Sequence, residues 1–308
     1  MALHAPSGRW RLGLTLALVT AAFWATLPVA LKLTLEQLDP YTLTWARFAF
    51  AAVVVGAWLA WRGEWGRFRT LGRRGWLLLA IAALMLVANY VLYLLGLAAT
   101  TPANAQLLIQ AAPLLMALGG IVVFRERFNG WQWLGLAAIA VGLLLFFGDQ
   151  LAKPAAPGSR YLLGSFLVLL GALVWAIYAL AQKQLLNSLS SFAILGFIYV
   201  FATFALWPLA HPSALFGMDA LHGIALAYCA INTLGAYGAF AEALAHWEAS
   251  RVSVVLSLTP LLTVATVEVV HAFAPALAKP ERIALLGWVG AGLVVAGSAV
   301  SSLMKSRG

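Results

Sequence analysis

Amide and phenol side chains recur at helical spacing inside stretches of this chain that are otherwise apolar. Asn89 and Tyr93 lie four residues apart with Tyr90 beside them, and Gln106 and Gln110 lie one turn apart further along. Residues three or four apart share one face of a helix. Buried amides and hydroxyls of this kind bind a neutral or zwitterionic solute, or they hydrogen-bond to neighbouring helices. Both interpretations stay open for each residue.

The second half of the chain carries a similar polar set, and two tryptophans accompany the pattern. Trp24 and Trp175 lie far from the ends of their apolar stretches, where an indole either stacks on a solute or packs in the core. The residues that we predict to contact a solute are Trp24, Asn89, Tyr90, Tyr93, Gln106, Gln110, Trp175, Tyr178, Asn232, Tyr237 and Ser257.

Two prolines and two ionisable residues also fall inside apolar stretches. Pro113 and Pro260 lie near the middle of theirs, where a proline removes a helical hydrogen bond. We predict them as hinges, with a static kink as the alternative. Arg47 and Glu268 lie at similar depth, which favours a charge pair between them. A buried arginine also suits a solute carboxylate, which it binds bidentately, or a purely structural role.

Catalytic and metal-binding patterns are missing from the sequence. The five histidines form no HxxxH or HExxH pair, and no GxxxxGK[ST] phosphate loop is present. Cys229 is the single cysteine, which excludes a disulfide framework and a CxxC metal site. We therefore expect no cofactor, no metal and no enzymatic activity. A membrane enzyme or a lipid flippase remains a less favoured alternative.

The elements that must position these residues are membrane-spanning helices. Of the 308 residues, 63% are hydrophobic and only 9% are charged, against about 25% charged in a soluble domain. A spanning helix needs about 20 apolar residues. The stretches between charges predict an all-α integral membrane protein with ten transmembrane helices, one each in 12–31, 40–61, 131–148, 161–182, 191–210, 220–244, 249–272 and 283–304, and two in 75–124.

The distribution of basic residues predicts the orientation. With the N-terminus inside, thirteen of the nineteen Lys and Arg fall in cytoplasmic segments and five on the opposite side. The positive-inside rule therefore places both termini in the cytoplasm of a cell (inner) membrane. The net charge of +9 follows from this rule and from attraction to anionic lipids, so we expect the bilayer and no nucleic acid as partner.

The two halves of the chain resemble one another. The sequence around Trp24 matches that around Trp175, Pro113-Leu114-Leu115 matches Pro260-Leu261-Leu262, and Gly135 and Gly142 match Gly290 and Gly297. The matches keep their order at nearly equal offsets, which predicts a first repeat in residues 1–150 and a second in 151–308. Because each half has five spans, an odd number, the second repeat enters the membrane inverted, as in many secondary transporters.

These motifs resemble the drug/metabolite transporter superfamily, in the branch with two EamA-type repeats. The features that carry the resemblance are Phe23-Trp24-Ala25, Arg47, Asn89-Tyr90, the run from Thr100-Thr101-Pro102 through Gln110 to Pro113, Arg125-Glu126-Arg127, and Gly135 to Gly142. The resemblance predicts the fold specifically, but it says little about the substrate.

The resemblance implies a secondary transporter that exports small metabolites by alternating access. Amino acids, neutral or aromatic, are the expected substrates, with drugs or other metabolites as the alternative, and we expect a monomer. One departure from the pattern is Glu126, which has no counterpart after the ninth span, where Phe273 stands. The seventh span likewise has no partner for Arg47.

Overall fold

Helices make up every regular element in the part of the chain that the structure describes. The computed structural model describes residues 9–124, 129–151, 158–185, 187–247, 252, 255–256, 258–278 and 283–303. The helices are α1 (Trp10–Thr34), α2 (Pro40–Trp61), η1 (Glu64–Thr70), α3 (Arg73–Ala99), α4 (Pro102–Leu108), α5 (Ala111–Phe124), α6 (Gly130–Leu151), α7 (Gly158–Leu185), α8 (Ser191–Leu206), η2 (Trp207–Leu209), η3 (Pro212–Gly217), α9 (Ala220–His246), α11 (Thr259–Phe273) and α12 (Leu285–Leu303).

Capping side chains define where several helices begin. The Asp39 carboxylate accepts hydrogen bonds from the backbone N–H groups of Tyr41 and Thr42, and Pro40 takes the first position of α2. Asp219 and Ser190 cap α9 and α8 in the same way. Such caps satisfy N–H groups that have no partner within the helix. The junctions between apolar stretches are therefore encoded locally.

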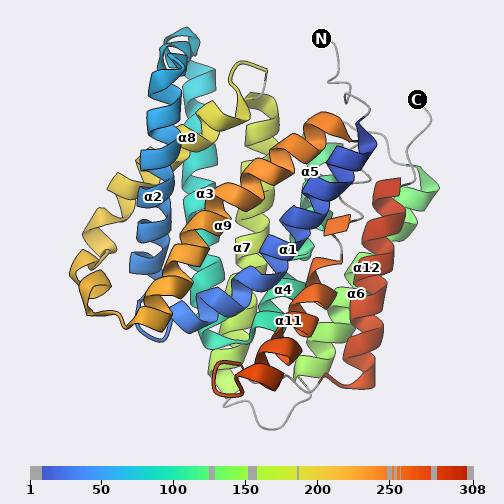
Figure 1. Ribbon diagram of the computed structural model, residues 1–308. Coiled ribbons are helices and arrows are strands. Elements are labelled where there is room, and N and C mark those ends of the chain that lie inside the picture. Colours follow the sequence, from blue (N-terminus) through green and yellow to red (C-terminus); the bar gives the residue numbers. More distant parts are fainter. Residues whose placement is uncertain are drawn as a thin grey trace.

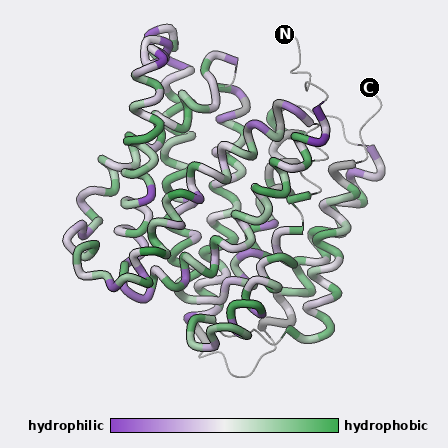
Figure 2. The backbone as a smooth tube through the Cα atoms, viewed as in Figure 1, coloured by the Kyte–Doolittle hydropathy of each residue, from purple (hydrophilic) through white to green (hydrophobic). Residues whose placement is uncertain are grey.

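Six helices are long and apolar enough to cross a membrane. They are residues 10–34, 40–61, 73–99, 160–182, 191–209 and 220–240, and the apolar stretches 130–146, 259–273 and 285–300 are shorter. Figure 2 shows hydrophobic residues along the helices and hydrophilic ones mainly near the turns. Large apolar side chains such as Val53, Leu144 and Phe204 are exposed on the bundle surface, as expected of a protein in lipid. The predicted all-helical membrane fold is confirmed, and the count of ten spans stays a prediction.

The second helix predicted in residues 75–124 is not continuous. It ends as α4 at Leu108, turns through Ile109 and Gln110, and restarts as α5 at Ala111. Pro113 is the third residue of α5, and Pro260 is the second residue of α11. The prediction that both prolines lie in the middle of a helix is therefore wrong. The first turn of a helix has N–H groups without intrahelical partners, so a proline there removes no hydrogen bond.

Helices from the two predicted halves pack against each other in a symmetric pattern. α2 packs on α8, and α6 packs on α12. α1 packs on α9, just as α7 packs on α3. Figure 1 shows α7 crossing the bundle in the direction opposite to α1. This pattern is the one expected of two repeats related by a two-fold axis in the membrane plane.

Glycines allow the closest of these helix pairs to touch backbone to backbone. A Cβ placed on Gly96 of α3 would lie 2.7 Å from the Gly164 carbonyl oxygen of α7. A Cβ on Gly142 of α6 would lie 2.5 Å from the Gly290 carbonyl oxygen of α12. Small residues at helix crossings are typical of membrane bundles, where close packing drives association.

Candidate functional site

An aromatic cluster lies where α2 and α3 meet α7, α8 and α9. The Phe48 ring is 4.5 Å from that of Tyr90 and 5.7 Å from that of Tyr199, measured between centroids. Trp24 contacts Tyr237 at 5.7 Å, and the Tyr90 and Tyr237 hydroxyls lie within interaction range of each other. The cluster thus joins side chains from both predicted repeats.

Arg47 lies buried beside this cluster. Only 3% of its surface is exposed, and its guanidinium carbon lies 4.9 Å from the centroid of the Tyr90 ring, a cation–π contact. Its Nε donates a hydrogen bond of 3.1 Å to the Thr233 hydroxyl on α9. Within the described part of the chain, no carboxylate pairs with this guanidinium. A buried charge without a counter-ion is costly, so this environment is unusual for a purely structural residue.

The predicted pair of Arg47 and Glu268 is wrong. Glu268 is exposed on α11, a helix that packs on α1 and α4, whereas Arg47 is buried between α2 and α9. Equal depth in the membrane therefore did not bring the two side chains together, because depth alone does not specify which helices are neighbours.

A narrow cavity opens between α2, α8 and α9 next to the aromatic cluster. Its polar lining includes Tyr199, Tyr237 and Ser191, and its apolar lining includes Val55 and Leu234. The Tyr199 hydroxyl is buried without a hydrogen-bond partner. The interior has room for about one water molecule, so the cavity is too small for a solute in this conformation.

Both asparagines that were predicted to contact a solute hydrogen-bond to a neighbouring helix. Asn89 of α3 donates a 3.0 Å hydrogen bond to the Gly171 carbonyl of α7. Asn232 of α9 donates a 2.7 Å hydrogen bond to the Phe23 carbonyl of α1. The two bonds occupy equivalent helix pairs of the two repeats, which favours the structural interpretation for both side chains.

The remaining predicted residues are distributed around the helix break. The Tyr93 hydroxyl donates to Gln106 Oε1 at 3.3 Å, and Gln110 lies half-buried in the turn between α4 and α5. The Trp175 ring lies 6.4 Å from that of Tyr178. It also packs against two hydrophobic clusters, one that contains Tyr178 and one beside the break between α4 and α5. Ser257 lies outside the described residues. The structure therefore brings Trp24, Tyr90, Trp175, Tyr178 and Tyr237 into one aromatic region with Arg47.

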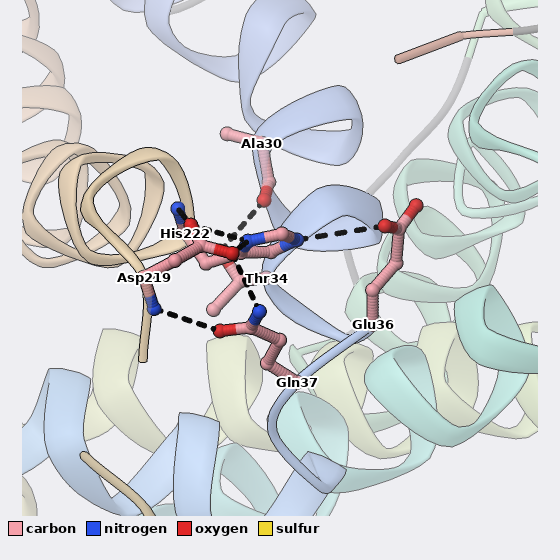
Figure 3. A network of polar contacts seen from close by, with 6 residues as sticks. All are labelled: Ala30, Thr34, Glu36, Gln37, Asp219 and His222. Carbon is pink, nitrogen blue, oxygen red and sulfur yellow. Dashed lines mark hydrogen bonds and ion pairs between the residues drawn. The ribbon is translucent and has the colours of Figure 1, made fainter. Parts of the chain in front are cut away.

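A second polar assembly joins the two predicted repeats at one end of the bundle. This end, here called the first-loop end, is the one at which the loop between α1 and α2 lies. Gln37 Nε2 donates to Asp219 Oδ2 at 2.7 Å, and the Asp219 N–H donates to Gln37 Oε1 at 3.2 Å. His222 lies between two carboxylates, with Nδ1 2.8 Å from Asp219 and Nε2 3.5 Å from Glu36 (Figure 3).

Two aspartates at the first-loop end, Asp219 in this assembly and Asp39 near it, have surroundings that favour their ionised form. Hydrogen bonds from the backbone N–H and imidazole of His222 lower the pKa of Asp219 to about 2. Nearby, partial burial acts to raise the pKa of Asp39, but hydrogen bonds from Thr42 and Tyr41 outweigh it and hold that pKa below its ordinary value. Both carboxylates are thus ionised near neutral pH.

Sequence reasoning missed several residues of these two regions. Thr233 and Tyr199 complete the surroundings of Arg47, and a hydroxyl within an apolar stretch was the signal available for each. Pro28 lies inside α1, where it leaves the Trp24 carbonyl without its helical N–H partner. His222 was considered only as a metal ligand, although its three-residue spacing from Asp219 indicated a helix cap.

Comparison with known proteins gives consistent matches over almost the whole chain. The model of the EamA-like transporter family matches residues 11–148 and 162–303. A protein of Haemophilus influenzae described as an uncharacterized transporter is 36% identical over 292 residues, which are 95% of each chain. The uncharacterized inner membrane transporter YhbE of Escherichia coli is 34% identical over 293 residues, which are 95% of this chain and 91% of YhbE.

A solved crystal structure shares the fold at low sequence similarity. The two chains are 20% identical with a TM-score of 0.63, over 97% of this chain and 98% of the other. The family model covers both halves of the chain, and the two bacterial relatives exceed 30% identity along nearly their full length. The chain therefore belongs to the EamA-like transporter family and is a multi-pass membrane transporter of the inner membrane.

Proposed function

We propose that the protein is a secondary transporter that exports small zwitterionic or neutral metabolites, with neutral and aromatic amino acids first among them. Its ten spans form two inverted repeats, residues 1–150 and 151–308, with both termini in the cytoplasm. Alternating access arises when one helix bundle rocks against the other about a central site. Amphipathic drugs are the second candidate class.

The interior side chains are the observation that carries the substrate class. Among the described residues, the buried polar groups in the bundle centre are amides and hydroxyls, together with the aromatic cluster and Arg47. A phosphate or nucleotide-sugar site needs several basic groups in one place. One guanidinium among aromatic rings and neutral donors suits an amino acid instead.

Interruptions in the helices support the location of the site. In the first repeat, the break between α4 and α5 precedes Pro113. At the matching position of the second repeat, α11 begins after Leu258, directly before Pro260. Paired interruptions in corresponding segments are typical of transporter sites near the midplane. Trp175 packs on both the aromatic cluster and the core beside the first break, which links the two features.

A counterflow screen with purified protein in proteoliposomes tests the proposed substrate class. We expect labelled leucine or phenylalanine to accumulate against unlabelled amino acid, while sugar phosphates and nucleotide sugars do not compete. Cells that overproduce the protein should also resist toxic amino-acid analogues. Transport of sugar phosphates without any amino acid would contradict the proposal. Chemical change of the recovered solute would instead indicate an enzyme.

The orientation is tested by labelling from outside the cell. A membrane-impermeant maleimide should label a cysteine replacing Gly158 on intact cells and leave one replacing Arg67 unlabelled until the cells are opened. The native Cys229 is fully buried and gives a low background. The reverse result would place the termini outside.

A further inference from the structure

Arg47 has more hydrogen-bond donors than the protein occupies. An arginine side chain offers five N–H donors. Here Nε binds the Thr233 hydroxyl, which itself donates to the Cys229 carbonyl at 2.9 Å. Within the described part of the chain, no acceptor is hydrogen-bonded to the remaining donors and no acidic side chain is paired with them. The flat end of the guanidinium thus has donors that no described protein group occupies.

A second unused donor lies near the guanidinium. The Tyr199 side chain is 1% exposed, its hydroxyl has no partner, and it lines the cavity between α2, α8 and α9. This hydroxyl lies within electrostatic range of Arg47, and the Phe48 ring packs between the Tyr90 and Tyr199 rings. A buried hydroxyl without a partner is unfavourable, so the Tyr199 hydroxyl is a donor that a ligand would satisfy.

We propose that Arg47 and the Tyr199 hydroxyl form a carboxylate-binding subsite, and that the protein selects monocarboxylates with an apolar or aromatic tail. This inference rests on the proposed export function and specifies its substrate. A guanidinium matches a carboxylate with two parallel hydrogen bonds, and the phenol supplies a third donor.

The surroundings of the subsite explain the restriction to one carboxylate. Arg47 is the single Arg or Lys among the buried side chains that the structure describes, so a second negative charge on the solute would lie in the interior without a counter-ion. The wall of the cavity that Tyr199 lines is formed in part by Val55, Leu195 and Leu234, which suit an apolar tail. Dicarboxylates are therefore excluded because their second charge has no counter-ion. Solutes with a polar tail are disfavoured because the apolar wall offers that tail no hydrogen-bond partner.

Matched ligands test the subsite on the unmodified protein. Binding is measured for each ligand directly, by calorimetry, using phenylalanine, its amide and phenethylamine, which differ in the group at the position of the carboxylate, and 3-phenylpropionate as a monocarboxylate without the amine. We expect the amide and the amine to bind at least about tenfold more weakly, the loss typical of one strong charged contact. Equal binding of acid and amide would overturn the subsite.

Variants then assign the effect to residues. Arg47→Gln should weaken phenylalanine binding at least about tenfold and should not weaken binding of the amide, which is a cation and gains nothing from the guanidinium. Arg47→Lys keeps the charge and should bind phenylalanine more tightly than Arg47→Gln does. Tyr199→Phe keeps the ring and removes only the hydroxyl, so it should weaken acid binding several-fold without affecting folding. Arg62→Gln, at the exposed end of α2, and Tyr41→Phe are the matched controls and should bind as wild type.

The outcomes separate this inference from the proposed function. If amino acids are transported and Arg47→Gln and Tyr199→Phe bind acid and amide as wild type does, the subsite is wrong and the export function stands. If amino acids fail to bind but other apolar monocarboxylates bind through Arg47, the subsite stands and the amino-acid function is wrong. Equal weakening of acid and amide by both variants would assign the two residues to the fold and overturn the subsite.

Discussion

At the scale of single residues, buried polar side chains in this transporter divide into those that hydrogen-bond to the backbone of another helix and those that do not. Asn89 and Asn232 belong to the first group, since each donates to a carbonyl of the helix packed against its own. Arg47 and Tyr199 belong to the second, with donors left unoccupied. We infer from this difference that Asn89 and Asn232 stabilise the bundle, and we propose Arg47 and Tyr199 as residues that contact solute.

Asn89→Ala tests this assignment. The change removes the hydrogen bond between α3 and α7, while the Gly171 carbonyl keeps its bond within α7, so we expect a loss of about 0.5–1.5 kcal/mol in unfolding free energy. Thermal unfolding in detergent measures the loss, and solute affinity of the folded fraction should equal that of wild type. Asn187→Ala, at an exposed turn, is the control. A specific fall in affinity without a fall in stability would place Asn89 in the solute path.

The sequence predicted which residues lie in the central region better than it predicted what each of them contacts. Trp24, Tyr90 and Tyr237 do lie together, because a polar or aromatic group at membrane depth must face protein rather than lipid. Which partner each side chain meets depends on neighbouring helices, which no spacing within one helix specifies. Arg47 illustrates the limit, since its contacts are Tyr90 and Thr233 rather than Glu268.

At the scale of elements, prolines differ in effect according to their position in a helix. Pro28 lies inside α1, where its ring removes a hydrogen bond to the Trp24 carbonyl. Pro113 and Pro260 lie in the first turns of α5 and α11, where the lost N–H has no intrahelical partner. Of these three prolines, Pro28 is therefore the one that reduces the stiffness of its helix.

Pro28→Ala and Pro113→Ala should have opposite effects on stability. Pro28→Ala restores a helical hydrogen bond, and the gain is as much as about 3 kcal/mol where neighbouring helices have not already compensated the proline. Pro113→Ala restores none and should cost about 0.4–1 kcal/mol, because proline restricts the unfolded chain. Thermal unfolding of the two variants gives the comparison, and counterflow by Pro28→Ala should be slower at unchanged affinity. Equal stabilisation by both changes would contradict this distinction.

The crossing of α6 and α12 gives a second test at the scale of elements. A Cβ on Gly290 would lie 2.6 Å from the Gly142 carbonyl oxygen, and the backbone cannot yield as a flexible side chain can. We therefore expect Gly290→Ala to destabilise the protein by about 1–3 kcal/mol. Gly292→Ala is the matched control on the same helix, because nothing lies within 4 Å of its Cβ, and it should be neutral or slightly stabilising. Similar melting temperatures for both variants would show that the helices cross less closely.

At the scale of the whole molecule, alternating access requires the two repeats to separate at each end in turn. At the first-loop end they are joined by Gln37, Asp219, His222 and Glu36 (Figure 3). Cys229 lies further along α9 than His222 and is fully buried, with its sulfur 4.0 Å from the Thr34 hydroxyl. Its reactivity therefore reports opening at this end.

Weakening the assembly should expose Cys229. We expect Gln37→Ala and His222→Ala to raise the rate of maleimide labelling several-fold, since less free energy opposes local opening. Ser213→Ala, at an exposed site nearby, is the control and should label as wild type does. Unchanged labelling in both variants would show that the assembly does not hold this end closed.

The overall architecture was predicted to the extent that composition and internal similarity determine it. Apolar stretches placed the six long helices within a few residues, because hydrocarbon thickness sets their length. The interruption at Ile109 and Gln110 was not predicted, since neither residue is a strong helix breaker and both lie in an apolar stretch. Pro113 was interpreted as a hinge or a kink in one helix, whereas it lies in the first turn of the next helix, α5.

The pairing of helices between repeats has a consequence for biosynthesis. α3 needs α7 for its close packing, and α2 needs α8, so neither helix has its partner until the ribosome has made more than half of the chain. During that interval the Asn89 amide and the Gly96 surface face lipid or a chaperone instead of Gly171 and Gly164. Unsatisfied polar groups in lipid cost several kcal/mol each, so a half-made bundle is less stable than the complete one. Chains truncated near the midpoint should therefore be rapidly degraded, which couples survival of the nascent protein to completion of its synthesis.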